Sequence, residues 1–396
     1  MALPLTGYRV LELAHLIAGP ACGMYLADMG ADVIKVENPD SGDASRTAYA
    51  LHLHGESAVF VTVNRNKRSL ALDLAHPDGR RVFHRLVEGV DVVIEAYRGG
   101  VAERLGIDYD TLAARNPRLV YCSLSAFGPT GPWREKPGLD MLVQAMGGLM
   151  AVTGEPDGAP ILTGAPVVDT IGALLAGQGI VTALLHRERT GQGQRVDVCL
   201  LDGLMLAHAA RLSIFLATGE EPGRHGSAHP YLSPFQAFAA RDGWIYVAAW
   251  IDRLWAPFCA AIERPDLVKG ERFATNELRV RHRAALNAIL APIFTHATVK
   301  EWMARLEARE VLCAPVNRYA DLTTDPQVAA TGMLVPDTHP RAGGFTSLGT
   351  PVRFGRTPGT IRTPAPQLGE HTELVLCEAG IAADEIARLR TAKVVA

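Results

Sequence analysis

The chain has 396 residues, 48% of them hydrophobic and 20% charged, and its 39 basic and 42 acidic residues leave a net charge of −3. This length exceeds what one core normally holds and predicts two domains, while the near balance of charges excludes a general affinity for nucleic acid. The six cysteines are far apart and no Cys/His cluster has the spacing of a metal site, so we expect free thiols and no metal.

The N-terminal segment, MALPLTGYRVLEL, has no basic stretch followed by a long apolar run, which predicts a cytoplasmic protein without a membrane span. Its last residues, Arg9–Leu13, are a predicted strand, followed by a turn from His15, a helix over Ala21–Met29 and a strand over Ala31–Glu37. This alternation predicts an α/β fold with a doubly wound, Rossmann-like parallel sheet. It continues with predicted strands Ser69–Asp73, Asp91–Glu95 and Leu119–Leu124 and predicted helices Pro77–Val87 and Val101–Leu105.

The first strand–helix–strand segment looks like half of a dinucleotide-binding fold, because the carboxylate of Glu37 closes the second strand about 20 residues after the first turn. The turn itself is AHLIAGPACG and lacks the GxGxxG pattern that holds a pyrophosphate. A nicotinamide-dependent dehydrogenase is therefore disfavoured, while a nucleotide-like ligand stays open.

A long predicted helix begins at Asp169 with DTIGALLAGQGIVTALLHRE and ends at Thr190-Gly191, before the strand-like segment GQRVDVCLL. Asp169 fits the N-cap position, where backbone amides and the positive end of the helix dipole favour an ionised carboxylate. An ionised carboxylate in such a place can attack an acyl thioester. An ordinary capping aspartate is the alternative, and the local sequence does not decide between the two.

The second half of the chain differs in character from the first. A hairpin is predicted from FQAFAA and WIYVAAW around Asp242-Gly243, and Thr298 is a predicted helix cap. We expect a large domain over residues 1–222, a small α+β domain over 223–330, and an extended arm over 331–396 that returns to the large domain. The predicted helices are Leu254–Ile262, Val280–Phe294, Val299–Arg309 and, at the C-terminus, Ala383–Thr391.

Several segments, in one order along about the first 205 residues, resemble family III (CaiB/BaiF) CoA transferases. They are VLELAHLIAGPACGMYLADMGADVIKVENPDSGD, NRNKRSLALDL, VIEAYRGGVAERLGI, LSAFGPTGPW and VDTIGALLAGQGIVTALLHRERTGQGQRVDVCLLDG, and GEHTE near the C-terminus also recurs in the family. No single segment is specific, but their order is. The resemblance places the catalytic aspartate of the family at Asp169.

The resemblance implies an enzyme that moves CoA from an acyl-CoA donor, succinyl- or acetyl-CoA, to a small carboxylic acid. In that family the aspartate forms a mixed anhydride with the acyl group, and the freed CoA thiolate then converts it to an aspartyl-CoA thioester. The CoA thioester is a substrate, and no tightly bound cofactor is implied. The family also forms interlocked dimers in which each chain threads the other's ring, so we expect a homodimer that binds neither nucleic acid nor membrane.

For CoA binding, the resemblance points to turns after the predicted strands and to a basic residue for a phosphate. The implied residues are Ile17, Ala18, Asn38, Leu72, Asp73, Ala96, Tyr97, Arg98 and Arg104. Taken singly, Leu72 and Ala18 are equally typical of a core. The chain departs from the oxalate-using relatives at Asn38, where they have a basic residue, and at Ala96, where they have asparagine.

The acceptor site is less clearly marked, because the run of glycines that covers the catalytic aspartate in those relatives is missing. His225 and His229, with Arg224, lie in the loop GRHGSAHPYLSP and are candidates for binding the acceptor carboxylate. A polar surface loop is the alternative for these three residues. Asp140 lies in a segment that the family places near the active site, where it could orient a substrate or cap a second helix.

Two other functions stay open at this point. An α-methylacyl-CoA racemase needs an acid and a base that flank the α-carbon, and those enzymes have a His-Asp pair where this chain has Leu139-Asp140. The missing histidine argues against racemisation. A non-enzymatic acyl-CoA-binding protein, in which Asp169 is only a helix cap, is the second alternative.

Overall fold

The computed structural model describes residues 2–396 and divides into two compact units. The first unit comprises the chain up to Leu149 together with Thr163–Gly219 and Gln327–Ala396, and the second comprises Met150–Leu162 and Glu220–Pro326. The short segment Met150–Leu162 belongs to the second unit, whereas the predicted large domain ran through it without a break. The chain therefore passes between the units more often than the sequence indicated.

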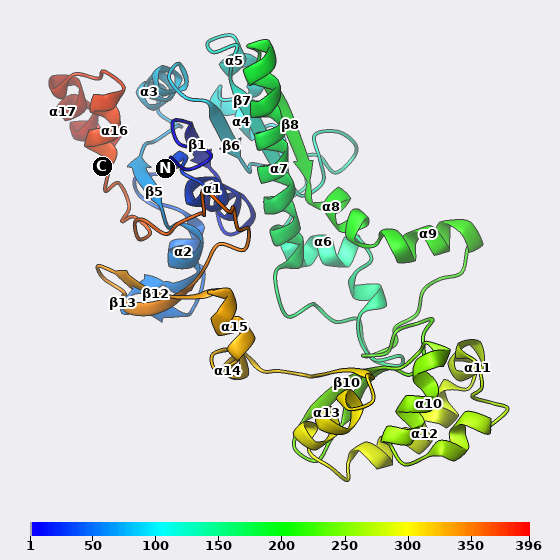
Figure 1. Ribbon diagram of the computed structural model, residues 1–396. Coiled ribbons are helices and arrows are strands. Elements are labelled where there is room, and N and C mark those ends of the chain that lie inside the picture. Colours follow the sequence, from blue (N-terminus) through cyan, green and yellow to red (C-terminus); the bar gives the residue numbers. More distant parts are fainter. Residues whose placement is uncertain (1) are drawn as a thin grey trace. The chain divides into compact units, whose positions relative to one another are not determined.

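A six-stranded parallel sheet forms the centre of the first unit, with the strand order β5-β2-β1-β6-β7-β8 (Figure 1). The order reverses between β1 and β6, which is the doubly wound arrangement. The predicted α/β fold with a Rossmann-like parallel sheet is thus confirmed. The strands are β1 (Arg9–Leu13), β2 (Asp32–Glu37), β5 (Lys67–Ala71), β6 (Val92–Glu95), β7 (Val120–Ser125) and β8 (Gln194–Cys199).

Helices cover both faces of this sheet, because side chains alternate between the two faces along each strand. Val10 packs in a core with α1 (Ala18–Asp28) and α7 (Val167–Thr190), while its neighbour Leu11 packs in the core on the other face. Helices α3, α4 and α17 have the bounds predicted for them. The helices of this second face are α3 (Pro77–Val87), α4 (Val101–Leu105), α5 (Tyr109–Ala113), α16 (Thr372–Glu378) and α17 (Ala383–Thr391).

Helix α7 is long and apolar enough to cross a membrane by length and composition. Helices α8 (Leu200–Ala207) and α9 (Ala209–Thr218) would pass the same test together as one bent span. In the structure, α7 packs against α1, β7 and β8, and its small residues Gly172 and Ala173 are buried there. The opposite side is open: Leu174, Val181 and Leu185 keep 50%, 45% and 53% of their surface exposed. One side of α7 is therefore core and the other is an apolar surface.

The second unit contains a three-stranded antiparallel sheet with the order β11-β10-β9, packed against helices α10, α12 and α13. The hairpin predicted around Asp242-Gly243 is confirmed, and Thr298 forms a capping box with Glu301. The single helix predicted over Val280–Phe294 is wrong, because α11 and α12 are separate and meet at His282. The elements are β9 (Phe235–Ala239), β10 (Trp244–Ala248), β11 (Leu312–Pro315), α10 (Asp252–Ala261), α11 (Asn276–Arg281), α12 (Arg283–Phe294) and α13 (Val299–Glu307).

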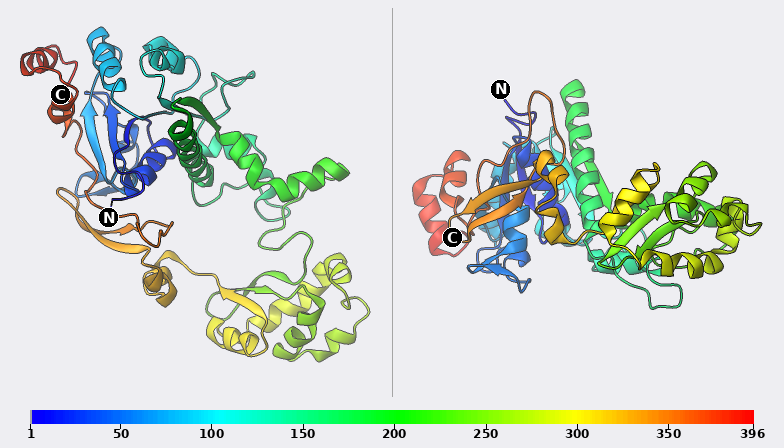
Figure 2. Two further views of the ribbon diagram at one scale, coloured as in Figure 1. Left: turned by 45° about the horizontal axis from the view of Figure 1, so that its top comes forward. Right: turned by 60° about the horizontal axis from the view of Figure 1, so that its bottom comes forward.

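The predicted arm contains a hairpin that the sequence did not indicate. Strands β12 (Leu334–His339) and β13 (Gly343–Leu348) pair antiparallel, following α15 (Pro326–Thr331). The hairpin lies beside the α2 region in Figures 1 and 2, where Arg341 forms an ion pair of 2.9 Å with Glu56. The remaining elements are η1 (Ala44–Arg46), β3 (His52–Leu53), β4 (Glu56–Ser57), α2 (Ala58–Val63), α6 (Asp140–Met146), η2 (Met150–Val152), α8 (Leu200–Ala207), α9 (Ala209–Thr218), η3 (Pro265–Lys269) and α14 (Tyr319–Leu322).

The two sequence motifs NRNKRS and GEHTE meet at the edge of the parallel sheet. The backbone N–H of His371 donates to Ser69 O at 3.0 Å, and Ala71 N–H donates to the Thr372 hydroxyl at 3.1 Å. These bonds satisfy groups of the edge strand β5 that would otherwise be unpaired. The C-terminal part of the chain thereby covers the open edge of the sheet.

Candidate active site

The switch point of the sheet carries a cavity of about 160 Å³. Leu13 and Glu95 are paired at the carboxyl ends of β1 and β6, so the turns that follow these strands lie side by side, where ligands bind in doubly wound folds. The turns contribute His15–Gly19 and Ala96–Arg98 to the cavity wall. Asp169, in the first turn of α7, lines the same cavity.

Asp169 is not the N-cap of α7, contrary to prediction. The helix begins at Val167 and its N-cap is Pro166, which has no side-chain group to offer. The cap comes instead from Asp140, whose Oδ2 accepts the backbone N–H of Val168 at 2.8 Å and of Asp169 at 3.0 Å. The carboxylate of Asp169 is therefore free of the capping role that the sequence assigned to it.

Asp140 is a supporting residue in the wall behind the cavity. It is the first residue of α6 and is buried, and its Oδ1 accepts the Gln144 amide at 2.6 Å. Gln144 Oε1 in turn accepts the N–H and the hydroxyl of Thr163 at 3.1 and 3.0 Å. Of the two roles left open for Asp140, the structure shows a helix cap, for α7, and Asp140 does not line the cavity.

The environment of Asp169 favours the neutral carboxyl, which corrects the expectation of an anion held by amides. Burial, with a smaller contribution from the charge of Asp140, raises the pKa of Asp169 to about 7. Within residues 2–396, no hydrogen-bond donor approaches this carboxyl group. Its anion is therefore poorly stabilised, which suits a nucleophile because no bonds have to be given up during attack.

Five of the predicted CoA-binding residues lie in this cavity with Asp169. They are Ile17, Ala18, Ala96, Tyr97 and Arg98. A second cavity of about 370 Å³ adjoins the first and shares Tyr97, Arg98, Ser125 and Arg134 with it. Together the two cavities are lined by residues at or just after the carboxyl ends of β1, β6 and β7.

The other four predicted CoA-binding residues lie away from this cavity. Asn38 is exposed after β2, where its Oδ1 accepts Asp40 N–H at 3.0 Å, and Leu72 is buried after β5. Asp73 Oδ1 accepts Ala75 N–H at 2.9 Å, and Arg104 lies in α4. Their own side chains mostly serve the turns in which they lie.

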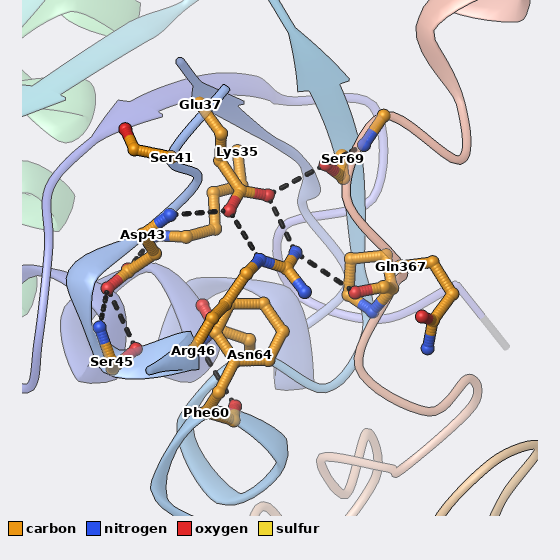
Figure 3. A network of polar contacts seen from close by, with 12 residues as sticks. Lys35, Glu37, Ser41, Asp43, Ser45, Arg46, Phe60, Asn64, Ser69 and Gln367 are labelled. Atoms are coloured by element: carbon orange, nitrogen blue, oxygen red, sulfur yellow. Dashed lines mark hydrogen bonds and ion pairs between the residues drawn. The ribbon is translucent and has the colours of Figure 1, made fainter. Parts of the chain in front are cut away.

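A network of buried charges supports the turn after β1 (Figure 3). Lys35, in the middle of β2, binds Glu12 Oε1 at 2.8 Å and Asp43 Oδ2 at 2.7 Å, and all three side chains are fully buried. Asp43 Oδ1 accepts the N–H of Leu16 at 3.1 Å, which holds Leu16 in a left-handed conformation with φ 67°. A lysine inside the apolar strand ADVIKVE was the sequence signal for this network.

Glu37 belongs to the same network and does not serve a ribose. Its carboxylate accepts Arg46 at 2.8 Å from two guanidinium nitrogens, Ser69 Oγ at 2.7 Å and Asp43 N–H at 2.9 Å (Figure 3). Protein donors thus occupy the carboxylate that a dinucleotide fold would offer to its ligand. This removes the remaining argument for a nicotinamide coenzyme.

The loop residues suggested for the acceptor acid lie in the second unit. Arg224 donates to Gly158 O at 2.6 Å and Glu155 O at 3.2 Å, so it binds its loop to the segment Met150–Leu162 of the same unit. The ring of His229 stacks on Phe235 with centroids 5.3 Å apart, and His225 lies in the same loop. No group of three or more potential metal ligands occurs within residues 2–396.

Sequence reasoning missed three basic or titratable side chains that line the cavity of Asp169, namely His15, Arg134 and Lys136. His15 directly follows the first strand, so its place at the carboxyl end of β1 was a usable signal. Arg134 and Lys136 lie in the loop after β7, whose course no periodic pattern marks.

The chain matches the family "CoA-transferase family III" over residues 5–372. A succinate–glutarate CoA-transferase of Agrobacterium fabrum is 37% identical over 95% of both chains, and a succinyl-CoA:mesaconate CoA-transferase of Haloarcula marismortui is 38% identical over 94% and 96%. The crystal structure of a CaiB/BaiF family protein from Brucella suis has a TM-score of 0.86 at 38% identity, covering 96% of this chain and all of that one. This chain therefore belongs to CoA-transferase family III and is a CoA-transferase.

Proposed function

We propose that this enzyme moves CoA from an acyl-CoA donor to a small carboxylic acid through covalent intermediates on Asp169. The observation that carries the proposal is the position of Asp169, which lines one cavity with the two turns at the switch point of the sheet. A carboxyl group with a pKa of about 7 and no competing donors can serve as nucleophile near neutral pH.

The reaction has a donor half and an acceptor half, and in each step one bond forms at a carbonyl carbon while another breaks. A carboxylate oxygen of Asp169 attacks the thioester carbonyl, the C–S bond breaks, and a mixed anhydride and CoA thiolate form. The thiolate attacks the aspartyl carbonyl, the anhydride C–O bond breaks, and the donor acid leaves. The acceptor carboxylate then attacks the aspartyl-CoA thioester, and the released thiolate collects the new acyl group and regenerates Asp169.

We place the thioester end of CoA in the cavity of Asp169, against the turns at Ile17 and Tyr97. The more distant residues Asn38 and Asp73 follow neighbouring strands β2 and β5, so they are candidates for the nucleotide end of an extended CoA. Arg98 and Arg134 line both adjoining cavities and supply positive charge for phosphate or carboxylate.

For the acceptor we propose a small dicarboxylate, with succinyl- or acetyl-CoA as donor. Three basic side chains line the cavity of Asp169, namely Arg98, Arg134 and Lys136. After one carboxylate of the acceptor has reacted, these residues can bind the second. Glutarate, mesaconate and oxalate appear in the names of relatives, and a panel of these acids with both donors tests the choice.

We also propose that the chain acts as a homodimer. The apolar outer side of α7 and the exposed Leu206 and Leu216 on α8 and α9 give the first unit a large apolar surface. Such a surface is unusual on a protein that remains monomeric. A second copy of the chain would cover it.

Trapping of the intermediate tests the role of Asp169. Wild-type enzyme incubated with acyl-CoA and hydroxylamine should acquire a hydroxamate at Asp169, detected by peptide mass spectrometry, while Asp169→Ala should lose both the adduct and transfer. Asp202→Ala is a matched control, because Asp202 occupies the same third position of α8. Substantial transfer by Asp169→Ala would contradict the proposal.

The same preparation separates transfer from racemisation. Leu139, which lines the cavity, stands where a racemase would have its histidine. We expect no deuterium wash-in at the α-carbon of a 2-methylacyl-CoA in the absence of an acid. Rapid wash-in under these conditions would favour the racemase instead.

A further inference from the structure

His15 shares the cavity of Asp169 but has no part in the reaction described so far. It lies at the carboxyl end of β1, and 36% of its side-chain surface is exposed. Its ring lies 6.4 Å from the ring of Tyr97 between centroids, so it stands beside the turn after β6. An imidazole in the wall of the cavity that holds the nucleophile is a group that can hold a proton near neutral pH.

Behind His15 lies a carboxylate that is fixed in its ionised form. Asp43 Oδ1 is 3.9 Å from His15 Nδ1, and the Asp43 side chain is fully buried. Besides Lys35, Asp43 accepts Ser45 N–H at 2.7 Å and the Ser45 hydroxyl at 2.8 Å (Figure 3). The Lys35 charge and these hydrogen bonds hold the pKa of Asp43 well below its usual range against the effect of burial. A negative charge therefore stands permanently beside the imidazole.

The chemistry at Asp169 has two needs, a group that accepts its proton and a positive charge beside the leaving thiolate. Its carboxyl proton must leave before attack, since burial raises the pKa of Asp169 to about 7. The CoA thiolate released by attack must then be held until it returns to the anhydride, and a thiolate in a half-buried cavity is stabilised by an adjacent positive charge.

We infer that His15 is a second catalytic residue, which accepts the carboxyl proton of Asp169 and, as imidazolium, pairs with the CoA thiolate. The inference rests on the proposed covalent route through Asp169. The proton moves from the carboxyl to the imidazole, the carboxylate attacks, and the C–S bond breaks beside the imidazolium. After the thiolate has formed its new bond, the proton remains on His15 or returns to Asp169 when that carboxylate is regenerated.

The groups around His15 act in opposite directions on the pKa of its imidazole. Burial lowers the pKa of His15, the charge of Asp43 raises it, and Lys35 lowers it further. These surroundings disfavour the imidazolium, and a negative charge that forms in the cavity favours it. The other titratable or charged groups that face it are Glu12 and Glu37 from the buried network, Tyr97 and Arg98 after β6, Arg134 and Lys136 after β7, and Asp169 on α7.

The variant His15→Gln tests this role without disturbing the core, because the side chain is partly exposed. Loss of the proton acceptor should lower kcat by about 100-fold, with the KM for acyl-CoA little changed. The acid limb of the pH profile should move to higher pH, since Asp169 must then lose its proton to water without an imidazolium beside it. His296→Gln, at an exposed histidine of the second unit, is the control and should leave both measurements unchanged.

A second variant tests the carboxylate behind the imidazole. Asp43→Asn keeps an oxygen for Leu16 N–H but removes the negative charge, so it should reproduce part of the loss of kcat seen in His15→Gln. In the double variant, kcat should fall by less than the product of the two single-variant factors. Thermal unfolding shows whether Asp43→Asn folds, and His15→Gln decides the question if it does not.

The outcomes for the proposed function and for His15 can be told apart. If wild-type enzyme forms no hydroxamate at Asp169, the proposed function fails and takes this inference with it. If the wild type forms the adduct and His15→Gln retains its kcat and pH profile, the role of His15 is overturned while that of Asp169 stands.

Discussion

Asp169 presents a carboxyl group at a helix start without using it to close the helix. The two amides at that point are already bonded to Asp140 Oδ2, so Asp169 is half-buried without gaining hydrogen bonds. Burial without compensation raises the pKa of a carboxyl group. The pKa of about 7 thus arises because Asp140 accepts the helix amides and the carboxyl of Asp169 is left without them.

Removal of the charge on Asp140 should make Asp169 more acidic. Asp140→Asn keeps an oxygen for the amides of α7 but eliminates the like charge that contributes to the raised pKa of Asp169. The acid limb of kcat/KM should move to lower pH, opposite to the shift expected for His15→Gln. The move should be smaller than the full upward shift of the Asp169 pKa, because burial is the larger cause of that shift. An acid limb that stays in place would show that the charge of Asp140 does not reach Asp169.

The half-buried carboxyl of Asp169 should also lower the free energy of unfolding at high pH. A carboxyl group whose pKa is raised by folding binds its proton more tightly in the folded chain, so stability falls as the pH rises from about 4 to 7. Asp169→Asn should therefore raise the free energy of unfolding by roughly 1–2 kcal/mol at pH 8, allowing for partial solvation, and by almost nothing at pH 4. Urea unfolding at the two pH values measures the difference, and an equal gain at both would contradict it.

The sequence located Asp169 but not its surroundings. Motif order singled out Asp169 through the family resemblance, and the strand–helix alternation predicted the parallel sheet, because both depend on local patterns. The cap from Asp140 is 29 residues distant, and the pairing of His15 with Asp43 depends on the course of the loop after β2. Contacts of that kind leave no periodic signal.

At the scale of elements, the NRNKRS motif is a clamp for the C-terminal part of the chain. Asn66 donates to Asp28 Oδ1 at 2.7 Å and Thr360 O at 2.8 Å, and its Oδ1 accepts Arg362 N–H at 2.6 Å. Arg65 contributes a 2.7 Å ion pair to the same Asp28. The arm was predicted as an extended segment that returns to the large domain, and these bonds show how the first unit binds it.

Loss of this clamp should loosen the arm selectively. Asn66 is buried and has φ 61°, a conformation that asparagine tolerates better than alanine. Asn66→Ala should lower the free energy of unfolding by about 2–4 kcal/mol, because several backbone groups lose their partner. Hydrogen exchange should increase first at residues 360–363, while Asn38→Ala, at an exposed asparagine, should leave that region protected. Uniform loosening of the whole unit would argue against a local clamp.

Helices and strands that are determined by their own local sequence were predicted well. Those that depend on contacts with distant residues were predicted poorly. Strand β1 and helix α3 occur with the predicted bounds, because an apolar run between polar turns and a Pro-initiated amphipathic segment each determine their own structure. The β12–β13 hairpin was missed, because its strands alternate weakly and part of its stability comes from Arg65, which donates to Ser347 Oγ at 3.1 Å.

At the scale of the whole molecule, the outer side of α7 predicts the interface of the proposed homodimer. Leu174, Val181 and Leu185 are spaced by seven and four residues, so they form one stripe on the helix. Figure 1 shows α16 on the other side of the same unit, across the sheet from α7. A stripe of large apolar residues outside the core is best covered by a second chain.

A charge in this stripe should therefore weaken self-association. Val181→Arg should raise the dimer dissociation constant by at least about 100-fold, because burying each valine stabilises by roughly 1.5–3 kcal/mol and a two-fold interface contains the residue twice. Light scattering at decreasing concentration measures the change. Leu374→Arg is the matched control, since Leu374 on α16 is 53% exposed against 45% for Val181, and it should leave the dimer intact. A monomeric wild type at all concentrations would refute the homodimer, and a shift caused equally by both variants would place the interface elsewhere.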